Sequence, residues 1–79
     1  MDKIMIQVIR AVGDLPRFTN LLRPDGSVYL PVEIMGMTAY GYNSEAGELW
    51  GFAVCVPRMT RKDTPQIIHA PFSIIKDDT

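Results

Sequence analysis

The first 26 residues show a spacing of apolar side chains that is typical of helices. Apolar residues recur at three- and four-residue intervals, and the polar residues between them fall on the opposite face. Asp2 is suited to cap the start of a first helix, and Gly13 is suited to end it. A strand over residues 3–12 remains the alternative, because this segment is rich in β-branched residues.

A second short helix is predicted directly after the first. Asp14 can cap its start, and Pro16 falls in the first turn, where a missing N–H costs nothing. The helix must end before Pro24. The segment Arg23–Gly26 then has the composition of a tight turn, since proline presets φ and glycine accepts a positive φ.

After this turn, apolar and polar positions alternate with a period of two, which predicts strands. Pro31 cannot donate to a ladder, so the first strand is expected at a sheet edge or with a bulge. Pro71 is expected to interrupt the last strand. The predicted strand segments cover residues 27–37, 38–43, 48–56 and 66–75.

The clearest local signal is the hairpin of the two middle segments. Gly47 suits the left-handed position of a three-residue loop. The resulting register pairs Tyr42 with Trp50 and Tyr40 with Phe52, which gathers the aromatic residues on one face. Small residues occupy the other face, and the pattern does not decide which face is exposed. These small residues are Ala39, Gly41, Gly51, Ala53 and Cys55.

Together these elements predict an α+β domain that spans residues 1–79. Two short N-terminal helices are expected to pack on an antiparallel sheet of three to four strands. Helices this short can cover only one face of the sheet, so the other face is expected to be covered by a second protein chain. We therefore expect a homodimer or higher oligomer, and binding to another protein.

Composition narrows the picture by exclusion. A chain of 79 residues holds one domain, and a net charge of −1 does not favour nucleic-acid binding. No run reaches about 18 apolar residues, so no membrane span is expected. Charged residues interrupt the apolar start, which argues against a signal peptide. The single cysteine fits a reducing compartment, and we expect a complete small cytoplasmic protein.

Few residues suit catalysis. His69 and Cys55 are the single histidine and the single thiol, and such a pair can form a nucleophile. A small Cys/His enzyme is the least favoured alternative, because Cys55 falls on the small-residue face, where cysteine behaves as a hydrophobe. The prediction is therefore no enzyme. Neither a metal-ligand spacing nor a glycine-rich phosphate loop is present, so no metal or cofactor is expected.

The remaining candidates are binding residues. Aromatic residues and methionine are enriched at protein interfaces. The candidate partner-binding residues are Tyr29, Met35, Met37, Tyr40, Tyr42 and Trp50. The one basic cluster is a candidate anion site and consists of Arg58, Arg61 and Lys62.

The favoured prediction is a non-enzymatic interaction module, a regulator or inhibitor that occupies a partner protein's surface, of the kind that viruses and mobile elements encode. The alternative from a different class is a protein that binds a small anionic ligand or nucleotide in a pocket between subunits. No motif in the chain identifies a family.

Overall fold

The computed structural model describes residues 6–76, which form five strands and no helix. The strands are β1 (Ile9–Val12), β2 (Phe18–Leu22), β3 (Val28–Asn43), β4 (Glu48–Pro57) and β5 (Ile68–Ile75). They join in one sheet in the order β1-β5-β4-β3-β2. The β1–β5 pair is parallel, and the other pairs are antiparallel.

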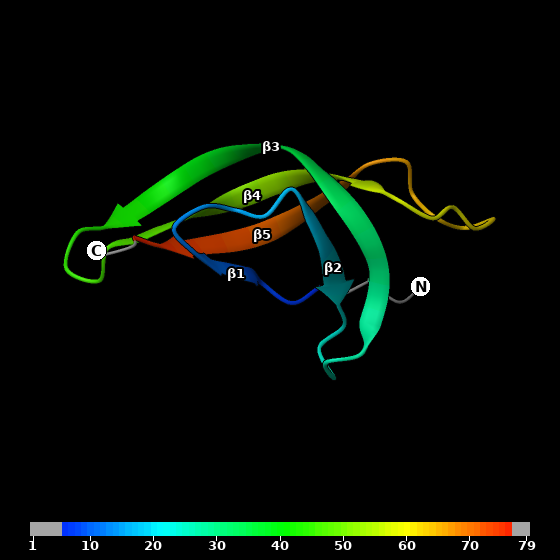
Figure 1. The fold of residues 1–79 in the computed structure, drawn as a ribbon, viewed down its shortest axis with the longest axis horizontal. Helices are drawn as coiled ribbons and strands as arrows, with labels where there is room; N and C mark the ends of the chain where they lie inside the picture. The colour runs from blue at the N-terminus through cyan, green and yellow to red at the C-terminus, as the bar shows by residue number, and fades with distance from the viewer. Residues whose placement is uncertain (1–5, 77–79) are drawn as a thin grey trace.

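The sheet curls because β3 is long and bent (Figure 1). The first part of β3 pairs with β2 and the later part with β4, with two register shifts along the β4 ladder that mark bulges. On the far side, the backbone N–H of Gln7 donates to the carbonyl oxygen of Leu22 at 2.9 Å. This bond links the segment before β1 to β2, so the sheet is a nearly closed barrel.

The inner surface of the barrel is the hydrophobic core. Leu21, Val32, Cys55 and Phe72 are its largest fully buried side chains. Ile6, Leu15, Tyr29 and Ile34 pack against the core as half-buried residues. The other buried apolar residues are Ile9, Leu30, Ala53, Ile68, Ala70 and Ile74.

The predicted α+β class with two N-terminal helices is wrong. Ile9–Val12 pairs with β5, and Phe18–Leu22 pairs with β3. These ladders satisfy the backbone of both segments, and their β-branched and aromatic residues suit strands, so long-range pairing overrides the helical spacing. The strand alternative is confirmed over Ile9–Val12. The predicted cap Asp2 lies outside the described residues.

The predicted hairpin exists, but its register is wrong. Gly47 has the expected positive φ of 64°, and the side-chain oxygen of Asn43 accepts hydrogen bonds from two loop N–H groups. The loop has four residues rather than three, so Asn43 pairs with Glu48 and Tyr42 pairs with Leu49. Tyr42 therefore shares the inner face with Leu49 instead of facing Trp50.

The two proline expectations are also corrected. Residues 27–37 and 38–43 belong to one strand, and Pro31 lies opposite Asn20 of β2 rather than at a sheet edge. The β4 ladder ends one residue later, at Val32–Pro57, so no N–H is needed from Pro31 on that side. Pro71 does not interrupt β5.

The turn Arg23–Gly26 is confirmed. Gly26 has a φ of 89°, and its N–H donates to the carbonyl oxygen of Arg23 at 2.9 Å. The Asp25 carboxylate accepts hydrogen bonds from the hydroxyl and the backbone N–H of Ser27. Both bonds lower the pKa of Asp25, and the bond from the hydroxyl has the larger effect. Within residues 6–76, no helix could cross a membrane.

Candidate functional site on the outer face of the sheet

Strand β4 presents its large side chains to solvent and its small ones to the core. Trp50 and Phe52 are 47% and 44% exposed, whereas Gly51 and Ala53 are buried. Successive side chains of a strand point to opposite faces, so this alternation defines an outer face and an inner face. The aromatic residues of β4 lie on the outer face.

The outer face continues across neighbouring strands. One row runs from Arg10 of β1 through Ser73 of β5 and Trp50 of β4 to Gly41 of β3. One neighbouring row on the same face contains Pro71 and Phe52, and the other contains Val12 and Ile75 at one end and Glu48 and Asn43 at the other. We call the following set the outer apolar face: Val8, Val12, Tyr40, Trp50, Phe52, Val54, Pro71 and Ile75.

Aromatic contacts give this face a defined shape. The Tyr40 and Phe52 rings meet edge to face, with their centroids 5.6 Å apart. The Trp50 ring lies against Gly41, at the place where a Cβ atom would otherwise stand. Gly41 therefore makes room for the indole, which a larger residue would displace.

A shallow hollow of about 560 Å³ lies on this face. Val8, Trp50 and Phe52 are among its apolar lining residues, and Arg10 and Glu48 supply charges of both signs. The Ser73 hydroxyl donates to the Glu48 carboxylate at 2.6 Å, which holds that carboxylate in place. The site is therefore an apolar surface with one cation and one fixed anion beside it.

The predicted partner-binding residues fall in three places. Tyr40 and Trp50 belong to the outer apolar face. Met35, Met37 and Tyr42 are exposed along the later part of β3, at 62%, 54% and 59%. Tyr29 is half-buried near the start of the same strand and packs against the core. The structure thus brings only two of the six, Tyr40 and Trp50, onto the outer apolar face.

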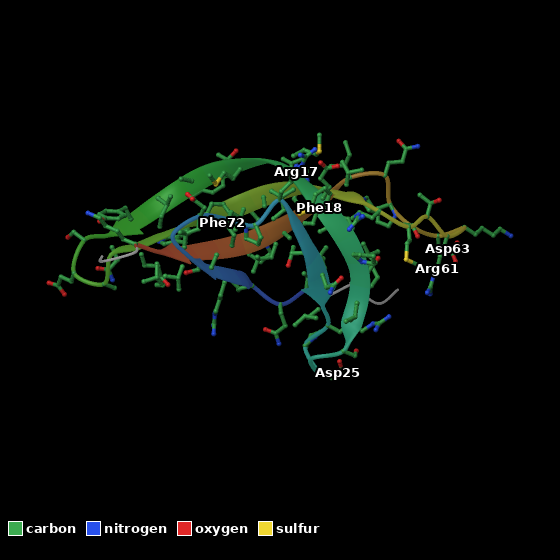
Figure 2. The ribbon with its side chains drawn as sticks, viewed as in Figure 1. Arg17, Phe18, Asp25, Arg61, Asp63 and Phe72 are labelled. Atoms are coloured by element: carbon green, nitrogen blue, oxygen red, sulfur yellow. The ribbon has the colours of Figure 1, made fainter. Side chains whose placement is uncertain are left out.

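The predicted anion cluster is divided. Arg61 and Lys62 line a hollow of about 610 Å³ between the loop after β4 and the start of β3, together with Arg23 and Asp63. Arg58 does not line it. Figure 2 shows Arg61 and Asp63 on this loop, well apart from Arg17 and Phe18.

Arg58 has a different contact. Its guanidinium lies 4.6 Å from the centroid of the Phe18 ring, and the Arg17 guanidinium lies 5.1 Å from the same centroid. Arg17 also pairs with Glu33 at 2.8 Å. These are cation–π contacts that shield the half-exposed Phe18 ring from water.

The sheet separates Cys55 from His69. Cys55 is fully buried on the inner face, and burial raises the pKa of its thiol. His69 is exposed and pairs with Val54, on the outer face. The two side chains therefore point to opposite sides of the sheet and do not form the nucleophile pair that the least favoured alternative, a Cys/His enzyme, requires. Among residues 6–76, no three potential ligand side chains gather as a metal site would require.

Several residues of the outer apolar face were missed by the sequence analysis. The sequence pattern predicts that Pro71 interrupts a strand, and it places Val8 and Val12 within the first predicted helix. For Pro71 the sequence signal is alternation: Ile68, Ala70, Phe72 and Ile74 are apolar at every second position and are buried, so Pro71 between them faces outward. Comparison with family models, with curated proteins and with solved structures finds no match to this chain.

Proposed function

We propose that the protein is a non-enzymatic interaction module that binds another protein through the outer apolar face. The observation that supports this most is the exposure of Tyr40, Trp50 and Phe52 on adjoining strands of one face. Contiguous exposed apolar patches with a polar rim mark interaction sites, and tryptophan and tyrosine dominate binding hot spots.

The chemistry of the face defines the kind of partner. An apolar protein surface would cover the aromatic rings, and opposite charges on that surface would meet Arg10 and Glu48. A nucleic acid fits less well, because Glu48 lies among the aromatic residues and the chain has a net charge of −1. Such a module acts as a regulator or inhibitor by occupying its partner's surface.

The test is capture of the partner from the native host by immobilised protein, with matched variants. Trp50→Ser should weaken binding at least about 30-fold, the effect of a hot spot worth about 2 kcal/mol. Ile67→Ser is the control, because Ile67 is 56% exposed and lies outside the outer apolar face. Equal capture by wild type and both variants would contradict the proposal, even if a protein is captured.

A second candidate function is the binding of a small anion at the hollow beside the loop after β4. Three cations, Arg23, Arg61 and Lys62, surround this hollow with one carboxylate, Asp63. Inorganic phosphate should then raise the melting temperature of the wild type and not that of Arg61→Ala. No shift with phosphate or with nucleoside phosphates would contradict it. The buried free thiol of Cys55 favours a reducing compartment such as the cytoplasm for either function.

A further inference from the structure

One edge of the sheet is left unpaired over nine residues. β2 covers β3 only as far as Glu33, and the N–H of Ile34 donates to the carbonyl oxygen of Arg17 at 2.7 Å. Beyond that point, Met35–Asn43 pairs with β4 on one side, and no other strand within residues 6–76 pairs on the other. In Figure 1 this part of β3 forms the upper margin of the molecule. We call it the free β3 edge.

The free β3 edge lacks the features that normally protect an edge strand. Met35–Asn43 contains no charged residue and no proline, and no other segment within residues 6–76 covers its edge. Natural proteins use lysine, proline or a covering element at such places, because unpaired backbone groups recruit another strand. Two bulges, at Met35 and Tyr40, are the only protective device here, and the run Gly36–Ala39 between them pairs regularly with β4.

We propose that the free β3 edge binds the same edge of a second copy of the chain, antiparallel about a two-fold axis at Thr38. In this register the side chains of the two copies complement each other in size. Thr38 meets its own copy, Met37 meets Ala39, and Gly36 meets Tyr40, so each large residue faces a small one. Opposed residues in antiparallel strands share a face, and Met37 and Ala39 both lie opposite inner-face residues of β4.

Charge and area also fit a second copy. Identical strands often repel because like charges meet, and this stretch has none. Met35, Met37 and Tyr40, which lie within the paired stretch, are 54–63% exposed, on the order of 400 Å² of side chain in each copy, against about 800 Å² per partner in a standard interface. The backbone and the small residues of the seven paired positions, Met35–Gly41, add to this area.

This dimer uses the strand edge and leaves open the residues of the outer apolar face that lie on β1, β5 and β4; Tyr40 of β3 is the one residue of that face that the dimer also uses. It therefore does not depend on the proposed function, and the two can fail separately. The dimer would place two outer apolar faces side by side in one continued sheet, which presents two partner sites.

The experiment is light scattering at high micromolar concentration on wild type and two lysine variants. Wild type and Val12→Lys should be dimers, because Val12 is 70% exposed on β1, at the opposite edge of the β1-β5-β4-β3 array. Met37→Lys should raise the dimer dissociation constant at least about tenfold, because a charged side chain on an edge strand opposes pairing with a second strand. A monomeric wild type, or an unchanged Met37→Lys dimer, would overturn the proposal.

Amide hydrogen exchange on the wild type keeps the proposal testable if Met37→Lys does not fold. The amides of Gly36–Ala39 that point away from β4 should become protected as protein concentration rises. Protection that appears only when a captured partner protein is added would assign the edge to that partner and overturn the second copy. Concentration-dependent protection confined to other strands would overturn it as well.

Discussion

Phe72 and Phe52 lie on neighbouring strands of one sheet, and their surroundings are opposite. Phe72 is 1% exposed in the barrel core, opposite Gly51, whereas Phe52 is 44% exposed on the outer face, opposite Pro71. Both faces of β4 and β5 are rich in apolar residues, so hydrophobicity does not sort them. Size sorts the residues of β4: Gly51 is the inward residue opposite the large Phe72 ring, and the next inward pair is Ala53 with Ala70, because a tightly curled sheet has a narrow interior.

The outer face teaches the complementary lesson. Its aromatic residues have room only outside the barrel, and within residues 6–76 no helix lies over them. An apolar surface that the fold leaves uncovered is a surface available to another molecule. The contrast between the two faces is therefore the basis of the proposed function, and the following changes test it.

The largest expected effect is the difference between the two phenylalanines. Phe72→Ala should lower the free energy of unfolding by about 3–5 kcal/mol, because it leaves a cavity in the core. For a domain of this size, that loss approaches the whole stability. Phe52→Ala should cost only about 1 kcal/mol, since it removes a half-exposed ring and its contact with Tyr40. Urea unfolding measures both, and equal losses would contradict the assignment of the faces.

The next largest effect is expected at Gly51, where the backbone of β3 leaves no space for a Cβ atom. A Cβ atom at Gly51 would lie 2.8 Å from the Cα atom of Ala39 and closer still to the carbonyl oxygen of Thr38. Gly51→Ala should therefore lower the free energy of unfolding by about 1–3 kcal/mol, as overpacking does. Gly36→Ala is the matched control, because no heavy atom lies within 4 Å of its Cβ position. It should change the free energy of unfolding by less than about 0.5 kcal/mol, and a larger loss there than at Gly51 would refute the packing argument.

A smaller effect is expected in the pH dependence of stability, because the Cys55 thiol is buried on the inner face. Burial raises the pKa of Cys55 above its ordinary value of 9.0. A thiol with a raised folded pKa contributes stability that is present below the unfolded pKa and is lost as pH rises through the folded pKa. Wild type should therefore lose stability above about pH 9 more steeply than Cys55→Ser, as urea unfolding at several pH values would show.

Alkylation provides the matched comparison. In Cys55→Ser/Val56→Cys the thiol moves one residue, from the inner face to the 37% exposed position of Val56 on the outer face. Iodoacetamide should modify that thiol on the order of 100-fold faster than Cys55 in the folded wild type. Equal rates would show that the inner face is open to solvent.

Local chemistry made part of the fold predictable. The turn at Gly26, the hairpin loop at Gly47 and the presence of β3, β4 and β5 follow from residues close together in the sequence. Backbone preference at glycine and alternation along a strand are local properties, so they can be interpreted without the fold.

The errors arose where distant segments decide the structure. The segments Ile9–Val12 and Phe18–Leu22 are short, and their strand state depends on partners in other strands, 63 residues away for the first segment and 6–15 residues away for the second. The register of the hairpin next to its turn depends on the length of the loop, and beyond Gly41 it also depends on bulges, which twist the sheet and have no clear sequence signal. A sequence pattern gives the apolar faces of β4, and only the curl of the sheet decides which face is inside.

The sequence predicts some of the residues of the candidate site, but it does not predict which of them lie together in the fold. Trp50 and Tyr40 are candidate partner-binding residues from the sequence alone, and they share the outer apolar face. Tyr42 was assigned to the same face because the loop was taken to be one residue shorter. Arg58 was grouped with Arg61 by proximity in sequence, whereas its guanidinium lies over the Phe18 ring.

Trp50 is the only tryptophan in the chain, so its fluorescence tests the outward position of the aromatic residues directly. At low protein concentration the folded protein should show red-shifted emission that acrylamide quenches efficiently, because Trp50 is 47% exposed. Binding of the captured partner should shift the emission to the blue and protect it from the quencher. Blue-shifted and unquenchable emission in the isolated, folded monomer would place Trp50 in the core and contradict the account.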